Sequence, residues 1–145
     1  MTTSYIADGR PTRRMRNDSM ATLMLVEDDP DLADALSELL RQEGYEVLVA
    51  NNGEEALERL KTTTPPAVIL LDLMMPKMNG WDFRAAQQED PELLKIPTIL
   101  ISAGTGIARA AGALGLRDYA QKPLDLDTLL ALIRVHLPEE SKAEA

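Results

Sequence analysis

The sequence contains no cysteine, which excludes disulfide bonds and thiolate metal sites and mildly favours a cytoplasmic location. It also has no apolar run close to the roughly 18 residues that suggest a membrane span. Positive charge is scarce, because 15 lysines and arginines face 24 acidic residues, giving a formal net charge of -9. This balance argues against nonspecific affinity for nucleic acid or for an anionic membrane.

Residues 1–20 differ from the rest of the chain because they carry four arginines and only two aspartates. They lack the apolar core of a signal peptide, so export is not indicated. Their low hydrophobicity predicts a disordered basic extension. Two alternatives stay open, namely translation that starts at Met20 and an arginine-rich arm that touches an acidic partner. The length of 145 residues suits one domain, predicted over 21–137 and followed by a charged tail over 138–145.

The stretch from Ala67 to Gly80 contains the most informative strand of the sequence. Its five apolar residues, 67–71, predict a strand buried on both faces, and the run ends on Asp72 before a turn. Ligands of open α/β sheets bind at the carboxyl ends of the strands. A carboxylate at that position therefore indicates chemistry, although this stretch alone leaves open an aspartate that caps the next helix.

Strand and helix patterns alternate along the whole domain. Strands are predicted over 22–26, 45–50, 67–72, 96–101 and 118–121. Helices are predicted from Pro30 to Glu43, from Gly53, after Gly80, over 107–114 and from about Asp125 to His136. Five strands that alternate with five helices predict an α/β fold with a doubly wound parallel sheet.

Polar side chains that can bind ions or take part in reactions follow four of the five predicted strands: Glu27 and Asp28, Asp72, Ser102, and Lys122. Because parallel strands share their carboxyl edge, these side chains should converge on one crevice. Crowded carboxylates raise one another's pKa unless a cation joins them, and an all-oxygen cluster suits Mg²⁺. Lys122 and the Ser102 hydroxyl fit an anion that the metal also touches, most simply a phosphoryl group.

These residues resemble the receiver domains of two-component response regulators over about 22–137. The resemblance is carried by the acidic pair after the first strand, D-L-M-M-P-K-M-N-G from Asp72 to Gly80, S-A at Ser102, and Y-A-Q-K-P from Tyr119 to Pro123. It implies the flavodoxin-like strand order 2-1-3-4-5. It also implies a stand-alone, chemotaxis-type regulator that receives phosphate from a sensor histidine kinase or a histidine phosphotransfer protein. Such a regulator would be a monomer or weak dimer and would signal to a downstream protein target.

The resemblance also assigns roles to individual residues. Asp72 would be the phosphoacceptor, and Glu27, Asp28, Asp72 and the backbone carbonyl of Met74 would hold Mg²⁺. Ser102 and Lys122 would contact the phosphoryl group, with Ser102 also part of the switch, and Tyr119 would be the aromatic switch. The peptide bond between Lys122 and Pro123 would be cis.

One feature departs from the family pattern. The interval from Ser102 to Lys122 is about two residues shorter than expected, and it contains four glycines. This shortening puts the length and stability of the fourth helix in doubt. Tyr119 could also be an ordinary half-buried strand residue with its hydroxyl in water.

Two other functions remain as alternatives. An Mg²⁺-dependent phosphohydrolase with an aspartate nucleophile usually has a second aspartate two residues later, whereas this chain has Met74 there. A receiver-like binding module that never accepts phosphate would not need the complete set of polar residues. We therefore expect a phosphoacceptor switch whose only catalysis is self-phosphorylation and slow self-dephosphorylation, and not an enzyme that turns over a substrate.

Overall fold

The computed structural model describes residues 21–75 and 77–137. The predictions for residues 1–20 and 138–145 lie outside this range. Five parallel strands form one sheet in the order β2-β1-β3-β4-β5. They are β1 (Thr22–Val26), β2 (Glu46–Ala50), β3 (Val68–Asp72), β4 (Thr98–Ser102) and β5 (Asp118–Gln121). This topology confirms the predicted doubly wound, flavodoxin-like sheet.

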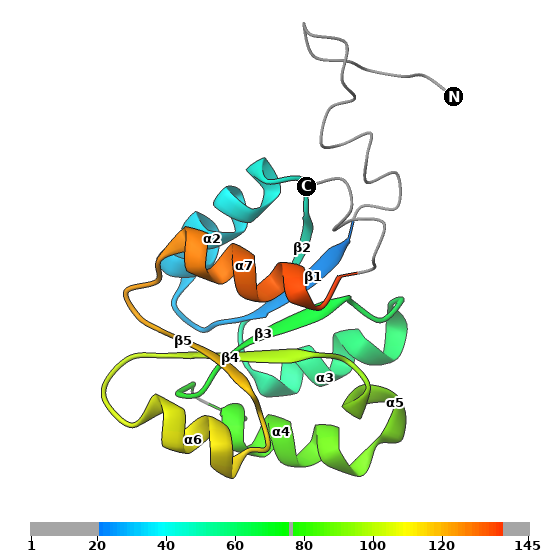
Figure 1. Ribbon diagram of the computed structural model, residues 1–145. Coiled ribbons are helices and arrows are strands. Elements are labelled where there is room, and N and C mark those ends of the chain that lie inside the picture. The colour runs from blue at the N-terminus through cyan, green and yellow to red at the C-terminus, as the bar shows by residue number, and fades with distance from the viewer. Residues whose placement is uncertain (1–20, 76, 138–145) are drawn as a thin grey trace, which may run out of the picture.

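Helices cover both faces of the sheet (Figure 1). They are α2 (Pro30–Gln42), α3 (Gly53–Thr62), α4 (Gly80–Glu89), α5 (Pro91–Leu94), α6 (Ile107–Ala113) and α7 (Leu126–Val135). Helices α2 and α7 lie on one face, and α3, α4 and α6 lie on the other (Figure 1). Within the described ranges, no helix is long and apolar enough to cross a membrane.

The central strands are buried on both faces, as their continuous apolar sequence predicts. Alternate residues of β1 serve different layers: Leu23 and Leu25 join the cluster under α2 and α7, whereas Met24 and Val26 join the cluster under α3 and α4. Every residue of β3 is buried, including Asp72 at its end. The sheet is thus a rigid frame that fixes where its carboxyl edge lies.

Short polar side chains set the helix starts. The side chains of Asp29, Asn52, Asn79 and Asp125 each accept hydrogen bonds from backbone amides in the first turn of α2, α3, α4 and α7. Because each of these caps follows the end of a strand, the helices begin directly beside the carboxyl edge of the sheet.

Helix α5 was not predicted, so the described residues contain six helices and not the expected five. Asp90 caps α5 and Pro91 is its first residue, which is the same N-cap and N1 pair that starts α2 at Asp29 and Pro30. The backbone amide of Ile96 bonds to the Leu93 carbonyl at 3.1 Å. The fourth strand consequently begins at Thr98, two residues later than predicted.

Candidate functional site

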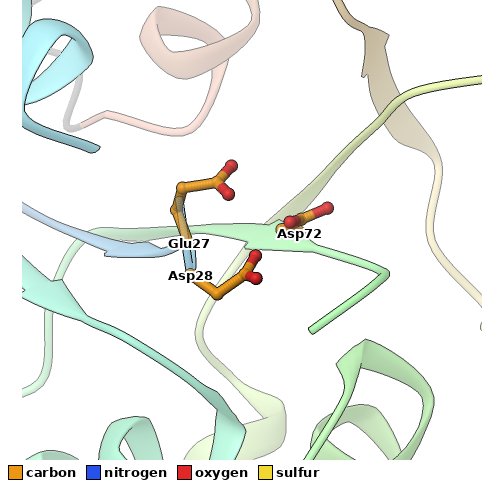
Figure 2. A group of neighbouring side chains, drawn as sticks. All are labelled: Glu27, Asp28 and Asp72. Carbon is orange, nitrogen blue, oxygen red and sulfur yellow. The ribbon is translucent and has the colours of Figure 1, made fainter. Parts of the chain in front are cut away.

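The strand register brings the predicted site residues to one edge of the sheet. Val26 pairs with Leu71, so Glu27 and Asp28 follow β1 where Asp72 ends β3. One oxygen from each of these three carboxylates can be chosen so that all lie within 4.8 Å of one another. Figure 2 shows the three side chains gathered at the ends of β1 and β3. The predicted acidic cluster is therefore assembled.

Lys122 places an ammonium group among these carboxylates. Its Nζ lies 2.8 Å from Glu27 Oε1 and 3.5 Å from Asp72 Oδ2. The Lys122 backbone amide donates to the Ser102 carbonyl at 2.8 Å, which fixes the end of β5 beside the end of β4. The peptide bond between Lys122 and Pro123 is cis, as the resemblance implied. Glu27 therefore has a second role that the sequence did not reveal, since it is the nearer partner of Lys122.

The surroundings of Asp72 disfavour its charged form. Burial and the nearby charge of Glu27 raise the pKa of Asp72 to about 7, and the Lys122 charge and the Met74 amide oppose this shift only in part. Burial acts to lower the pKa of Lys122, but its hydrogen bond to Glu27 and the charge of Asp72 outweigh burial, so the net shift is upward. Lys122 alone does not neutralise the cluster.

The donor set fits a hard divalent cation. It consists of carboxylate oxygens without histidine or cysteine, and the raised Asp72 pKa shows that a further positive charge would stabilise the ionised form. The Met74 amide donates to Asp72 Oδ1 at 3.4 Å, and the Met74 side chain is 69% exposed. The role of the Met74 carbonyl as a metal ligand stays a prediction.

Ser102 and Tyr119 occupy the strands on the other side of Asp72. Asp72 pairs with Ile101 in the sheet, so Ser102 follows immediately beyond it at the same edge. Ser102 is buried, and its hydroxyl donates to the carbonyl of Ala103 at 3.4 Å. Tyr119 lies three residues before Lys122 on β5 and is 42% exposed. The switch roles of Ser102 and Tyr119 stay predictions.

The loop after Asp72 is held by two glycines whose importance the sequence did not show. The amide of Gly80 donates to the Leu73 carbonyl at 2.9 Å, and a Cβ at Gly80 would lie 2.7 Å from the Asp72 carbonyl oxygen. The amide of Gly53 donates to the Met78 carbonyl at 2.8 Å. These contacts fix the loop after Asp72 between the starts of α3 and α4, and only glycine at 80 allows the close approach.

Comparison with known families agrees with this geometry. A family model described as the response regulator receiver domain matches residues 23–134. The chain belongs to this family. Receiver domains of response regulators bind Mg²⁺ at their acidic site and interact with histidine kinases or phosphotransfer proteins.

This receiver domain is also similar to named proteins. The transcriptional regulatory protein CpxR of Escherichia coli K12 is 40% identical over 120 residues, which cover 81% of this chain and 50% of CpxR. Vibrio cholerae chemotaxis protein CheY4 is 27% identical with a TM-score of 0.72, covering 81% of this chain and 99% of CheY4. Thermotoga maritima TrrA, solved in complex with Mg²⁺-BeF, is 26% identical with a TM-score of 0.72, covering 81% and 100%. The receiver domain spans about half the length of the curated relatives it matches.

Proposed function

We propose that this receiver domain accepts a phosphoryl group on Asp72 from a histidine kinase or a histidine phosphotransfer protein. It then signals through protein contacts that depend on phosphorylation. The observation that carries this proposal is the position of Asp72, a buried carboxylate at a strand end between two acids and the Lys122 ammonium. This arrangement sets one carboxylate apart from the others and provides positive charge where phosphoryl oxygens would gather.

The transfer step needs the ionised form of Asp72. One Asp72 carboxylate oxygen attacks the phosphorus in line and forms an acyl phosphate, while the bond between phosphorus and the donor's imidazole nitrogen breaks and that nitrogen keeps the electron pair. Glu27, Asp28, Asp72 and the Met74 carbonyl would hold Mg²⁺, which when bound neutralises the acids and the phosphoryl oxygens. Lys122 turns from Glu27 toward the new phosphoryl group, because its Nζ already lies 3.5 Å from Asp72.

The phosphoryl group then changes the neighbouring strands. Ser102 is one residue beyond the sheet neighbour of Asp72, so its hydroxyl can donate to a phosphoryl oxygen once the loop after β4 moves. That movement opens space for Tyr119, now 42% exposed, to turn inward. The two positions of Tyr119 would give the surface of α6, β5 and α7 two states, and a downstream protein target would bind one of them.

A recess beside Lys122 suits the phosphodonor. It has a volume of about 350 Å³ and lies between α2 and the segment that joins β5 to α7. Its lining is mainly apolar: Leu32, Ala35, Leu36, Leu39, Lys122, Pro123, Leu124 and Leu126. An amphipathic helix of the donor, docked in this recess, would lie next to the Lys122 side of the site. On this placement α2 would form one wall of the surface on which the phosphodonor docks.

The two alternative functions have less support. A phosphohydrolase would need an acid or base two residues after the nucleophile, and the exposed Met74 side chain cannot exchange protons. A module that never accepts phosphate would have no use for the partly buried ion pair of Lys122 and Glu27 beside Asp72. We propose no enzymatic turnover of free substrates.

Phosphotransfer from a panel of autophosphorylated histidine kinases tests the proposal. The protein should take up radioactive phosphate from at least one kinase within seconds to minutes, and it should not steadily hydrolyse p-nitrophenyl phosphate. Sustained hydrolysis would favour the enzyme. No uptake from any kinase or from acetyl phosphate, in the presence of Mg²⁺, would favour the inert module.

A further inference from the structure

Helix α4 contains a buried cation whose partners are backbone carbonyls. Arg84 is 7% exposed, and no carboxylate within residues 21–75 and 77–137 forms an ion pair with it. Its Nε donates to the Leu114 carbonyl at 2.9 Å and its Nη2 to the Gly115 carbonyl at 3.4 Å. The exposed Gln88 adds a bond to the Leu114 carbonyl at 3.3 Å. Two side chains of α4 thus hold the C-terminal end of α6, and we name these contacts the α6 anchor.

The anchor is itself fixed in the core. Arg84 Nη1 donates to Gln87 Oε1 at 2.8 Å, and Gln87 Nε2 donates to Thr98 Oγ1 at 3.0 Å and to the Leu93 carbonyl at 3.1 Å. This network ties α4 to α5 and to the start of β4. Burying a guanidinium group is costly unless its donors are satisfied, so Arg84 has little freedom to leave these carbonyls.

The other end of α4 is tied to the phosphoacceptor. Gly80, its first residue, donates its amide to the Leu73 carbonyl at 2.9 Å and packs directly against the backbone of Asp72. Arg84 follows one turn later on the same helix. Helix α4 therefore connects the backbone of Asp72 to the C-terminal end of α6, through the hydrogen bond of Gly80 at its start and those of Arg84 one turn later.

The N-terminal end of α6 has fewer side-chain hydrogen bonds within the described residues, although its first residue, Ile107, is buried. Its N-cap is Gly106, which offers no side-chain cap, and both Gly104 and Gly106 have φ of 84°. Within the described residues, the side-chain hydrogen bond that reaches this loop from another element comes from the exposed Gln121 to the Gly104 carbonyl. This end is also the one that follows Ser102 and the phosphoryl site.

We propose that Arg84 is a positioning residue that makes α6 a one-ended lever. The C-terminal end of α6 stays anchored to α4, and the N-terminal end moves when the loop after Ser102 responds to phosphorylation. This inference rests on the proposed function for the trigger, but the anchor is a property of the unphosphorylated protein. It confines the backbone movement of the loop and α6 to about residues 103–111 and keeps the backbone at the start of β5 in place, while the Tyr119 side chain stays free to turn.

Amide hydrogen exchange by NMR tests the lever directly. In the free protein the amides of Leu114 and Leu116, which bond to carbonyls of α6, should exchange several-fold more slowly than that of Ala110, which bonds to the Gly106 carbonyl. Addition of Mg²⁺ and beryllofluoride, a phosphate analogue, should change the exchange rate of the Ala110 amide several-fold. The exchange rates of Leu114 and Leu116 should stay within about twofold of their values in the free protein.

Arg84→Met and Gln88→Ala provide the variants, and Glu89→Ala, the adjacent exposed position of α4, is the matched control. Arg84→Met removes the donors at similar bulk and should abolish the slow exchange of Leu114 and Leu116 and extend the beryllofluoride response to them. Gln88→Ala keeps the buried network and should give a smaller change in the same direction. Arg84→Lys should partly restore the wild-type pattern, because an ammonium group can still donate to a carbonyl.

The exchange rates decide whether α6 is a one-ended lever. Uniform exchange along α6 in the free wild type, or an equal beryllofluoride response at both ends, would overturn the lever. An exchange pattern identical to that of the wild type in a folded Arg84→Met variant would also overturn it. If Arg84→Met does not fold, an exchange pattern identical to that of the wild type in Gln88→Ala would overturn it. Failure of beryllofluoride to bind would count against the proposed function, while the free-protein comparison would still decide whether the anchor exists.

Discussion

At the scale of single residues, the decisive feature is a carboxyl group whose charge is disfavoured before phosphorylation. The pKa of Asp72 is raised from 3.8 to about 7, mainly by burial and then by the charge of Glu27. A phosphodonor that meets the protonated form meets no nucleophile. The cation that the cluster would bind thus has two effects: it offsets the repulsion, and it favours the reactive form of Asp72.

Asp72→Asn should stabilise the metal-free protein at about pH 8. The folded protein binds the Asp72 proton more tightly than the unfolded chain, so between pH 3.8 and about 7 its stability falls as pH rises, and above that range the penalty is complete. Asparagine removes the charge, and the gain in unfolding free energy should be about 2–4 kcal/mol at pH 8, shrinking toward zero near pH 4. Urea unfolding in a chelator across this pH range provides the measurement.

Asp34→Asn is the matched control, because Asp34 is an exposed acid of α2 outside the cluster. It should change the unfolding free energy little at any of these pH values. Added Mg²⁺ should stabilise the wild type and Asp34→Asn more than Asp72→Asn. A wild type that is as stable as, or more stable than, Asp72→Asn at pH 8 without metal would contradict the repulsion.

Met74 predicts a long-lived acyl phosphate. Its side chain is apolar and 69% exposed, so it lies at the surface near Asp72 and has no group that could orient an attacking water. Met74→Asn should accelerate the decay of the phosphorylated protein by up to about tenfold, equivalent to roughly 1.4 kcal/mol of barrier. Decay followed after removal of the phosphodonor would show this, and equal rates for the two proteins would disprove the account.

At the scale of elements, α6 is shorter than α2, α3, α4 and α7. It has seven residues, and its sequence is rich in alanine and glycine. The short interval between Ser102 and Lys122 had put this helix in doubt, and the structure shows that it forms but stays short. An element this short suits a switch, because a small change in free energy shifts its population.

Two glycine substitutions in and beside α6 should have opposite effects. Gly112 lies inside the helix with open space at its Cβ position, so Gly112→Ala should raise the unfolding free energy by about 0.5–1 kcal/mol through helix propensity. Gly106 has equal space but a φ of 84°, so Gly106→Ala should lower it by about 1–2 kcal/mol. Thermal unfolding of the two variants checks this pair, and effects of the same sign would refute the argument.

The elements that the sequence predicted well are those with local signals. Strand β1 and strand β5 have the predicted boundaries because apolar runs and turn residues delimit them. Helix α5 could also have been found, since Asp90 and Pro91 repeat the start signal of α2. The start of β4 was harder to predict, because it depends both on the turn of α5 and on Pro97, which has no amide hydrogen to donate.

At the scale of the whole molecule, the sequence predicted which residues meet at the edge of the sheet, but it did not predict the long-range polar contacts between the helices. The convergence of Glu27, Asp28, Asp72, Ser102 and Lys122 followed from one rule, that parallel strands end at one edge. The α6 anchor could not be foreseen, because Arg84 and Leu114 are far apart in sequence and Arg84 looks like an ordinary surface charge of an amphipathic helix. Long-range polar contacts of this kind leave no periodic signal in a sequence.

The most direct test of the account is the chemical location of the phosphoryl group. After incubation with acetyl phosphate and Mg²⁺, intact mass should show one added phosphoryl group, and borohydride trapping followed by peptide sequencing should place it on Asp72. Chelation of the metal should reduce labelling strongly, and Asp72→Asn should show none. A phosphoryl group on another residue, equal labelling of Asp72→Asn, or labelling unaffected by the chelator would contradict the claim that Asp72 is a metal-dependent phosphoacceptor.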